Sequence, residues 1–142
     1  MNDALMPLEE RVKHAQLLAE ADLLPEQYRK KPANILLVQE AAEHLGISMF
    51  AATQQITIIK GRPTMSAELM RALVLKQGHR FTVVESTADV CRVEVARKEW
   101  PDDVSTFAFT MADADAAGLS KSPTYQRHPK AMLLARVTTQ AC

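Results

Sequence analysis

Apolar residues recur at helical spacing in the first part of the chain. The segment 8–22, LEERVKHAQLLAEAD, places them three or four residues apart, and the preceding Pro7 favours a helix start at this point. A second helix is predicted from Pro32 to the residue before Gly46, because glycine readily takes the left-handed conformation that ends a helix. Ser48 is a candidate N-cap for a short third helix through Thr53.

The pattern then changes to one that is typical of strands. Residues 55–59 are rich in β-branched side chains, Lys60-Gly61 is a tight-turn candidate, and residues 62–65 return as a short strand. A helix over residues 67–77 is followed by three strands at 81–85, 90–97 and 104–109. The short turns between them favour antiparallel pairing. Their alternation predicts that six side chains face the helices: Val83, Cys91, Val93, Val95, Phe107 and Phe109.

Helices close the predicted fold. Thr110 with Asp113 resembles a capping box that uses Asp in place of Glu, and it opens a helix ending at Gly118. A loop through Tyr125 precedes a last helix that starts at Pro129. The predicted fold class is therefore α+β: an antiparallel β-meander with flanking helices, preceded by a β-hairpin and N-terminal helices.

Composition excludes several classes of protein. The 142 residues are 47% apolar and 24% charged, as expected for a soluble globular protein. No run approaches the roughly 18 apolar residues of a membrane span, and the acidic N-terminus does not resemble a signal peptide. Two cysteines cannot build a disulfide framework, so we expect a reducing, cytoplasmic location without membrane contact.

The net charge is zero, but the charges form blocks. Residues 1–26 are net −4 and residues 81–117 are net −5, whereas residues 56–80 and 118–142 are each net +4. The last block contains no acidic side chain. Two basic blocks that meet on one face would attract nucleic acid, although clustering on a solvated surface explains such blocks equally well.

The sequence contains no recognisable set of catalytic residues. It lacks a phosphate-binding GxxxxGK[ST] loop, and its four histidines are not spaced as metal ligands. Asp113 and Asp115 are explained by a helix start, and Cys91 by packing within a strand. We therefore predict no enzyme activity, no metal and no cofactor.

One remaining sequence pattern is typical of a site that binds phosphate groups and bases. Residues 125–130, YQRHPK, bring an aromatic ring and cations to the start of a helix, where free N–H groups favour phosphate. Tyr125 is a candidate for stacking on a base. Lys60 and Arg62 place two cations on a hairpin turn. Taken singly, these residues are explained better by an ordinary loop and a solvated turn.

Five stretches in order resemble the RecT family of phage single-strand annealing recombinases, from about residue 23 onward. They are YRKKPANIL from Tyr28, QEAAEHLGISM from Gln39, ITIIKGRPTM from Ile56, FTMADA from Phe109, and the segment with Lys121, Tyr125, Pro129, Met132-Leu133 and Ala135-Arg136. Lys60 stands where the family usually has Asn, Tyr125 where Trp is common, and His128 where Tyr is common.

This resemblance implies ATP-independent binding and annealing of single-stranded DNA in phage-type homologous recombination, on a β-β-β-α core. It also implies homo-oligomeric rings or filaments, an annealed duplex intermediate, a possible partner exonuclease, and a phage or prophage protein in the bacterial cytoplasm. It divides the chain into an acidic N-terminal helix and connector, residues 1–27, and an annealing core, residues 28–142. That core is expected to be incomplete at the C-terminus, because the family continues beyond this point.

The expected DNA-binding residues are Lys60, Arg62, Lys121, Tyr125, Arg127, Lys130 and Arg136, and the sequence predicts that the two basic blocks line one groove. Arg136 alternatively supports the groove wall or makes a buried ion pair. The competing hypothesis is a non-catalytic assembly or accessory protein that uses these basic patches for protein contacts. The acidic first helix is expected to be peripheral or an assembly arm, because its charge repels phosphate.

Overall fold

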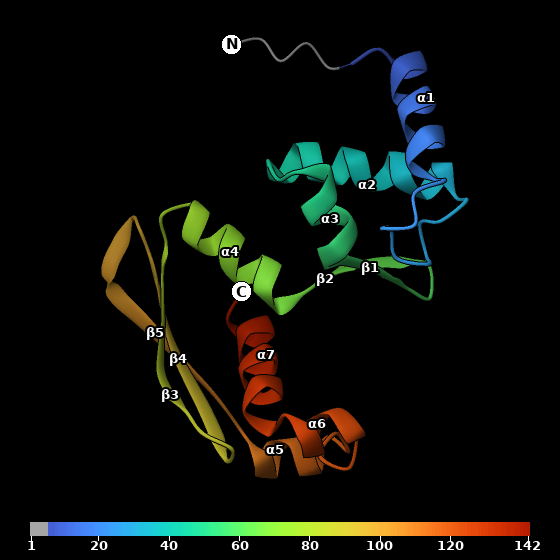
Figure 1. Cartoon of the computed structure of the whole chain (residues 1–142). Helices are drawn as coiled ribbons and strands as arrows, with labels where there is room; N and C mark the ends of the chain where they lie inside the picture. Colours follow the sequence, from blue (N-terminus) through green and yellow to red (C-terminus); the bar gives the residue numbers. More distant parts are fainter. Residues whose placement is uncertain (1–5) are drawn as a thin grey trace. The chain divides into compact units, whose positions relative to one another are not determined.

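The fold is α+β, as predicted, and the computed structural model describes residues 6–142 (Figure 1). The chain divides after Ser66 into two compact units, and the boundary after residue 27 that the sequence suggested lies inside the first of them. Residues directly after that boundary are anchored within the first unit. Tyr28 is fully buried and its hydroxyl donates to the carbonyl of Ile56 at 2.7 Å, while the amide of Lys30 donates to Ala19 at 2.8 Å.

The first unit holds three helices and a hairpin: α1 (Leu8–Leu18), α2 (Pro32–Leu45), α3 (Met49–Gln55), β1 (Ile56–Ile59) and β2 (Arg62–Met65). Gly46, at φ 62°, ends α2, and the Ser48 hydroxyl accepts from the amide of Ala51 at 3.1 Å to cap α3, both as predicted. Helix α1 ends four residues earlier than predicted, because the amides that follow Ala19 turn back to carbonyls only three residues away. It also packs on α2, through the buried Ala15 and an Arg11–Glu43 ion pair at 3.6 Å.

The second unit packs helices against a three-stranded sheet: α4 (Ala67–Lys76), β3 (Arg80–Ser86), β4 (Val90–Arg97), β5 (Trp100–Thr110), α5 (Met111–Ala116), α6 (Pro123–Arg127) and α7 (Pro129–Ala141). The strand order is β3-β4-β5 and every pair is antiparallel, so the predicted meander is confirmed. Strand β5 begins at Trp100, where the sequence suggested a turn until Val104. Helix α6 lies where the sequence suggested a loop.

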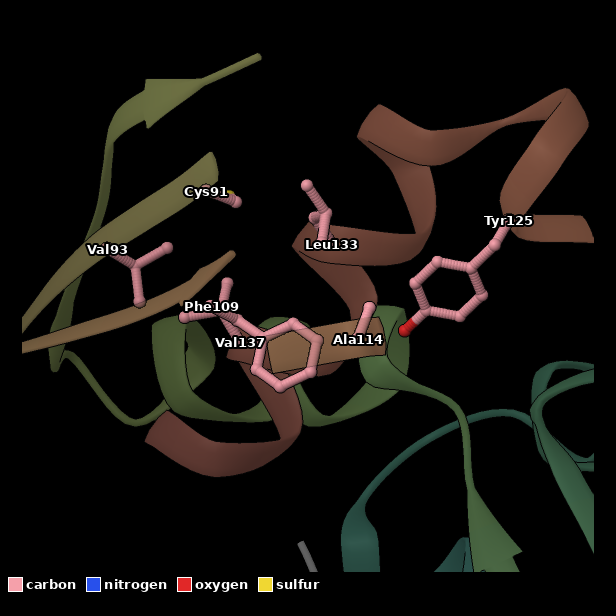
Figure 2. Close-up of a cluster of buried hydrophobic side chains, with 7 residues drawn as sticks. All are labelled: Cys91, Val93, Phe109, Ala114, Tyr125, Leu133 and Val137. Carbon is pink, nitrogen blue, oxygen red and sulfur yellow. The ribbon is translucent and has the colours of Figure 1, made fainter. Parts of the chain in front are cut away.

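The core of the second unit lies between this sheet and α7 (Figure 2). Its buried members come from β4, β5 and three helices: Cys91, Val93, Phe109, Ala114, Tyr125, Leu133 and Val137. Of the six strand residues predicted to face the helices, three are therefore buried. Phe107 packs against the core and Val95 is half-buried. The prediction is wrong for Val83, which is 37% exposed, because β3 is an edge strand with a register irregularity directly after this residue.

Candidate nucleic-acid interface

Three cations of the last basic block lie around the short break between α6 and α7. Lys121 precedes α6, Arg127 is the last residue of α6, and Lys130 is in the first turn of α7. All three side chains are exposed, as is His128 between the helices. We call Lys121, Arg127, His128 and Lys130 the α6–α7 basic surface.

Local sequence explains why the chain holds these residues together. Pro123 begins α6, and the Ser122 hydroxyl accepts from the amide of Tyr125 at 3.4 Å. The amide of His128 donates the last backbone hydrogen bond of α6, to the carbonyl of Thr124. The carbonyl of His128 accepts the first backbone hydrogen bond of α7, from the amide of Met132. One residue therefore separates the two helices, and Pro129 starts the second of them.

The electrostatics of this surface favour an anion. In the part of the chain that the structure describes, Lys121, Arg127 and Lys130 form no ion pair within 4.0 Å. Among the described residues, no side chain caps the N-terminus of α7, which carries the positive end of the helix dipole. Cations at that end repel the dipole and one another, and a bound phosphate relieves both repulsions.

Tyr125 does not have the accessibility that stacking requires. Its side chain is only 5% exposed and extends from α6 toward Ala114 within the core (Figure 2). A buried ring presents no free face to a base, so Tyr125 is not accessible in this structure for the stacking role that the sequence suggested. Tyr125 instead anchors α6, and thereby positions Arg127.

Arg136 lies further along α7 and is exposed. Its guanidinium carbon is 5.9 Å from the centroid of the Phe109 ring, a cation–π arrangement, and not a buried ion pair as one alternative proposed. It also lines a cavity of about 280 Å³ with Tyr125 and Met132. Arg136 is therefore held against the core at the side of α7.

Lys60 and Arg62 belong to the other unit. Both are exposed at the turn of the β1–β2 hairpin. Lys60 and Gly61 have positive φ values of 50° and 78°, which is typical of a type I′ turn. The structure describes this hairpin and the α6–α7 basic surface in separate units, so a shared groove stays a prediction.

The sequence prediction gave no functional role to one prominent exposed residue. Trp100, the only tryptophan of the chain, is 59% exposed at the β4–β5 hairpin, and the Arg97 guanidinium carbon is 5.8 Å from its ring centroid. The sequence placed Trp100 in a turn. That the chain has a single tryptophan was the signal available in the sequence. Its pairing with Arg97 depends on a register shift between β4 and β5, which the alternation of apolar and polar residues does not reveal.

Between residues 6 and 142, no group of three or more His, Cys, Asp or Glu side chains is arranged to hold a metal ion. Cys91 is buried in the sheet, and burial raises the pKa of its thiol, which keeps it protonated and unreactive.

Within the same residues, no single helix is long and apolar enough to cross a membrane. Helices α2 and α3 together reach that length and composition, but they are bent by 109° at the break between them.

Comparisons of the chain with protein-family models, curated proteins and solved structures find no match. The resemblance to the RecT family therefore depends on the sequence stretches quoted above.

Proposed function

We propose that this protein binds single-stranded DNA and anneals complementary strands without ATP, in the manner of the RecT recombinases that its sequence resembles. The observation that carries the proposal is the α6–α7 basic surface, whose cations are exposed, unpaired with acids in the described chain, and set at the positive end of α7. Annealing needs no covalent chemistry. It requires a surface that holds a backbone by its phosphates and leaves the base edges free to pair.

The proposal includes the setting that the resemblance implies. The protein acts as a homo-oligomer in the cytoplasm of a bacterial host, on single strands exposed by a partner exonuclease. The three-stranded meander followed by helices agrees with the β-β-β-α core expected of such a protein.

The test is a salt titration of binding, followed by fluorescence anisotropy of a labelled single-stranded oligonucleotide. Affinity is expected to fall log-linearly with salt, with a slope near −0.7 for each neutralised phosphate. Arg127→Gln and Lys130→Gln should each weaken binding to all sequences alike and make the slope shallower by about 0.7. Lys13→Gln is the matched control, because it makes the same charge change at an exposed position of the acidic helix α1.

Unchanged affinity and slope in folded Arg127→Gln and Lys130→Gln variants would contradict the proposal. The second candidate, an accessory protein that contacts other proteins, would then be favoured. Its specific support is the first unit, where large apolar side chains are exposed on all three helices, among them Leu8, Leu37 and Phe50. Exposed apolar surface of this kind is typical of protein contacts.

A further inference from the structure

Residues of the β4–β5 hairpin line a cleft in the second unit, and Figure 1 shows this hairpin at the end of the sheet opposite α5. Two cavities, of about 440 Å³ and about 510 Å³, share Val95, Arg97, Trp100 and Ala141 among their lining residues. Volumes of this size are usual for small-ligand sites. We call this combined space the Trp100 cleft.

The hairpin holds Trp100 in place by several contacts. Trp100 of β5 pairs with Arg97 of β4, and the next pair is Val104 with Ala96. Residues 101–103 of β5 therefore have no partner residues in β4 and form an irregularity in the ladder. Such irregularities commonly re-aim a side chain beside a binding site. The Arg80 guanidinium donates to the carbonyl of Pro101 at 3.3 Å, which ties this irregularity to β3.

The lining of the cleft has the chemistry of a base site and not of a phosphate site. Arg97 and Asp103 both line the first cavity and Glu99 lines the second, so the cleft has more acidic than basic side chains, in contrast with the α6–α7 basic surface. The Trp100 ring offers a broad apolar face, and Asp103 and Ser105 offer hydrogen-bonding groups. A nucleobase combines a flat apolar face with a polar edge, so it matches both kinds of lining.

We infer that the Trp100 cleft binds a base of a single nucleic-acid strand, stacked on Trp100 beside the Arg97 guanidinium. This inference rests on the proposed function and names the aromatic contact that the buried Tyr125 does not supply. Helix α7 links the two sites, because its N-terminus carries the basic surface and Ala141 lines the cleft. At ~1.5 Å per residue, the twelve-residue interval from Pro129 to Ala141 corresponds to about 18 Å, so a strand several nucleotides long is needed to reach both.

We assign nucleic acid as the ligand of the Trp100 cleft because Arg97 and Trp100 lie in the same unit as the α6–α7 basic surface, whose cations are unpaired with acids in the described chain. Arginine beside an aromatic ring adds a cation–π contribution to stacking on a base. A strand held by its phosphates at α7 brings its bases to the cleft at high effective concentration.

The test uses the intrinsic fluorescence of Trp100, which is the only tryptophan and therefore reports this site alone. A single-stranded oligonucleotide should quench this fluorescence, while anisotropy of a labelled strand records binding independently. An oligonucleotide of the same length without bases keeps the phosphates and should bind without quenching. Trp100→Ala should weaken binding of the base-containing strand by roughly 5-fold to 150-fold, the range found for loss of one stacked base.

Two further variants separate stacking from unfolding. Trp100→Phe keeps an aromatic face and should retain most of the affinity. Val84→Ala removes apolar surface from another exposed position of the sheet, outside the cleft, and should bind like the unaltered protein.

The possible outcomes distinguish this inference from the proposed function. Strand binding without quenching, together with full affinity in Trp100→Ala, overturns the base site and leaves the proposed function standing. Quenching by a free nucleoside without any strand binding supports the base site and overturns the proposed function. Absence of both signals at low salt overturns both.

Discussion

At the scale of single residues, Lys60 occupies a backbone conformation that suits another amino acid better. Its φ of 50° lies in the left-handed region, which costs a lysine free energy, whereas asparagine tolerates it and is favoured at this position of type I′ turns. We expect Lys60→Asn to raise the free energy of unfolding by about 0.5–1 kcal/mol, measured by denaturant titration.

The neighbouring glycine provides the matched control for this prediction. Gly61 has φ 78° and no atom within 4 Å of the position that a Cβ would take, so Gly61→Ala introduces backbone strain without a clash. It should lower the free energy of unfolding by about 1 kcal/mol. A Lys60→Asn variant that is no more stable than the unaltered protein would show that this turn is not strained at Lys60.

The capping box of α5 makes stability depend on pH. The backbone amide and the hydroxyl of Thr110 both donate to Asp113 Oδ2 at 2.8 Å, and these bonds hold the pKa of Asp113 below its usual value of 3.8. A carboxylate whose pKa is lowered on folding stabilises the fold above its usual pKa, and this contribution is lost as the pH falls through the folded value.

We therefore expect Asp113→Asn to be less stable than the unaltered protein at neutral pH, and the two unfolding curves to converge below pH 3.8. Asp115→Asn makes the same charge change on α5 outside the capping box, so it serves as the control. A stability difference for Asp113→Asn that persists unchanged into strong acid would contradict this account.

At the scale of elements, α7 connects the sheet core to the candidate interface. Leu133 is fully buried against β4 and β5, so Leu133→Ala should lower the free energy of unfolding by about 2–5 kcal/mol. Leu75→Ala, on the half-exposed side of α4, should cost much less. Thermal unfolding followed by circular dichroism checks both variants, and equal losses would mean that α7 is not the principal support of this core.

Sequence patterns predicted the elements whose signals are local. The hairpin at Lys60-Gly61, the cap at Ser48 and the capping box at Thr110 are each set by residues within a few positions of one another, and all are present. The sequence predictions were wrong where contacts between residues far apart in the chain determine the local structure. Tyr125 follows a proline in a polar stretch that suggests a loop, yet contacts with the core make it a buried residue of a helix.

The candidate site was predicted less completely for the same reason. Charge blocks marked Arg127 and Lys130, because an absence of acids is visible in the sequence alone. The Trp100 cleft was missed because it requires the register of β4 against β5 and the end of α7, and neither is encoded within a short window.

At the scale of the whole molecule, the second unit has a core built only from its own residues. Every member of the buried cluster lies between Cys91 and Val137, within the unit that starts at Ala67. We therefore expect residues 67–142, expressed alone, to fold cooperatively and to keep both the α6–α7 basic surface and the Trp100 cleft. Circular dichroism and two-dimensional NMR test this, and Leu133→Ala in the same fragment provides a destabilised reference. A fragment without dispersed amide signals would contradict it.

The contribution of the first unit to binding can be counted through the salt slope. The slope reports the number of neutralised phosphates and does not depend on how the two units are arranged. If Lys60 and Arg62 both contact a strand, replacing both with Gln in the full chain should make the slope shallower by about 1.4, which is twice the value for one phosphate. Lys60→Asn alone should then change the slope by half as much, and it is expected to stabilise the hairpin. A loss of binding in this variant therefore cannot be attributed to unfolding.

The isolated second unit supplies an internal check on this count. If the two hairpin cations are the only residues of the first unit that contact the strand, residues 67–142 should bind with the same shallower slope as the doubly substituted full chain. If the full chain, the double variant and the isolated unit share one slope, every phosphate contact belongs to the second unit. The single groove that the sequence predicts from two basic blocks would then be wrong, while binding by the α6–α7 basic surface would stand.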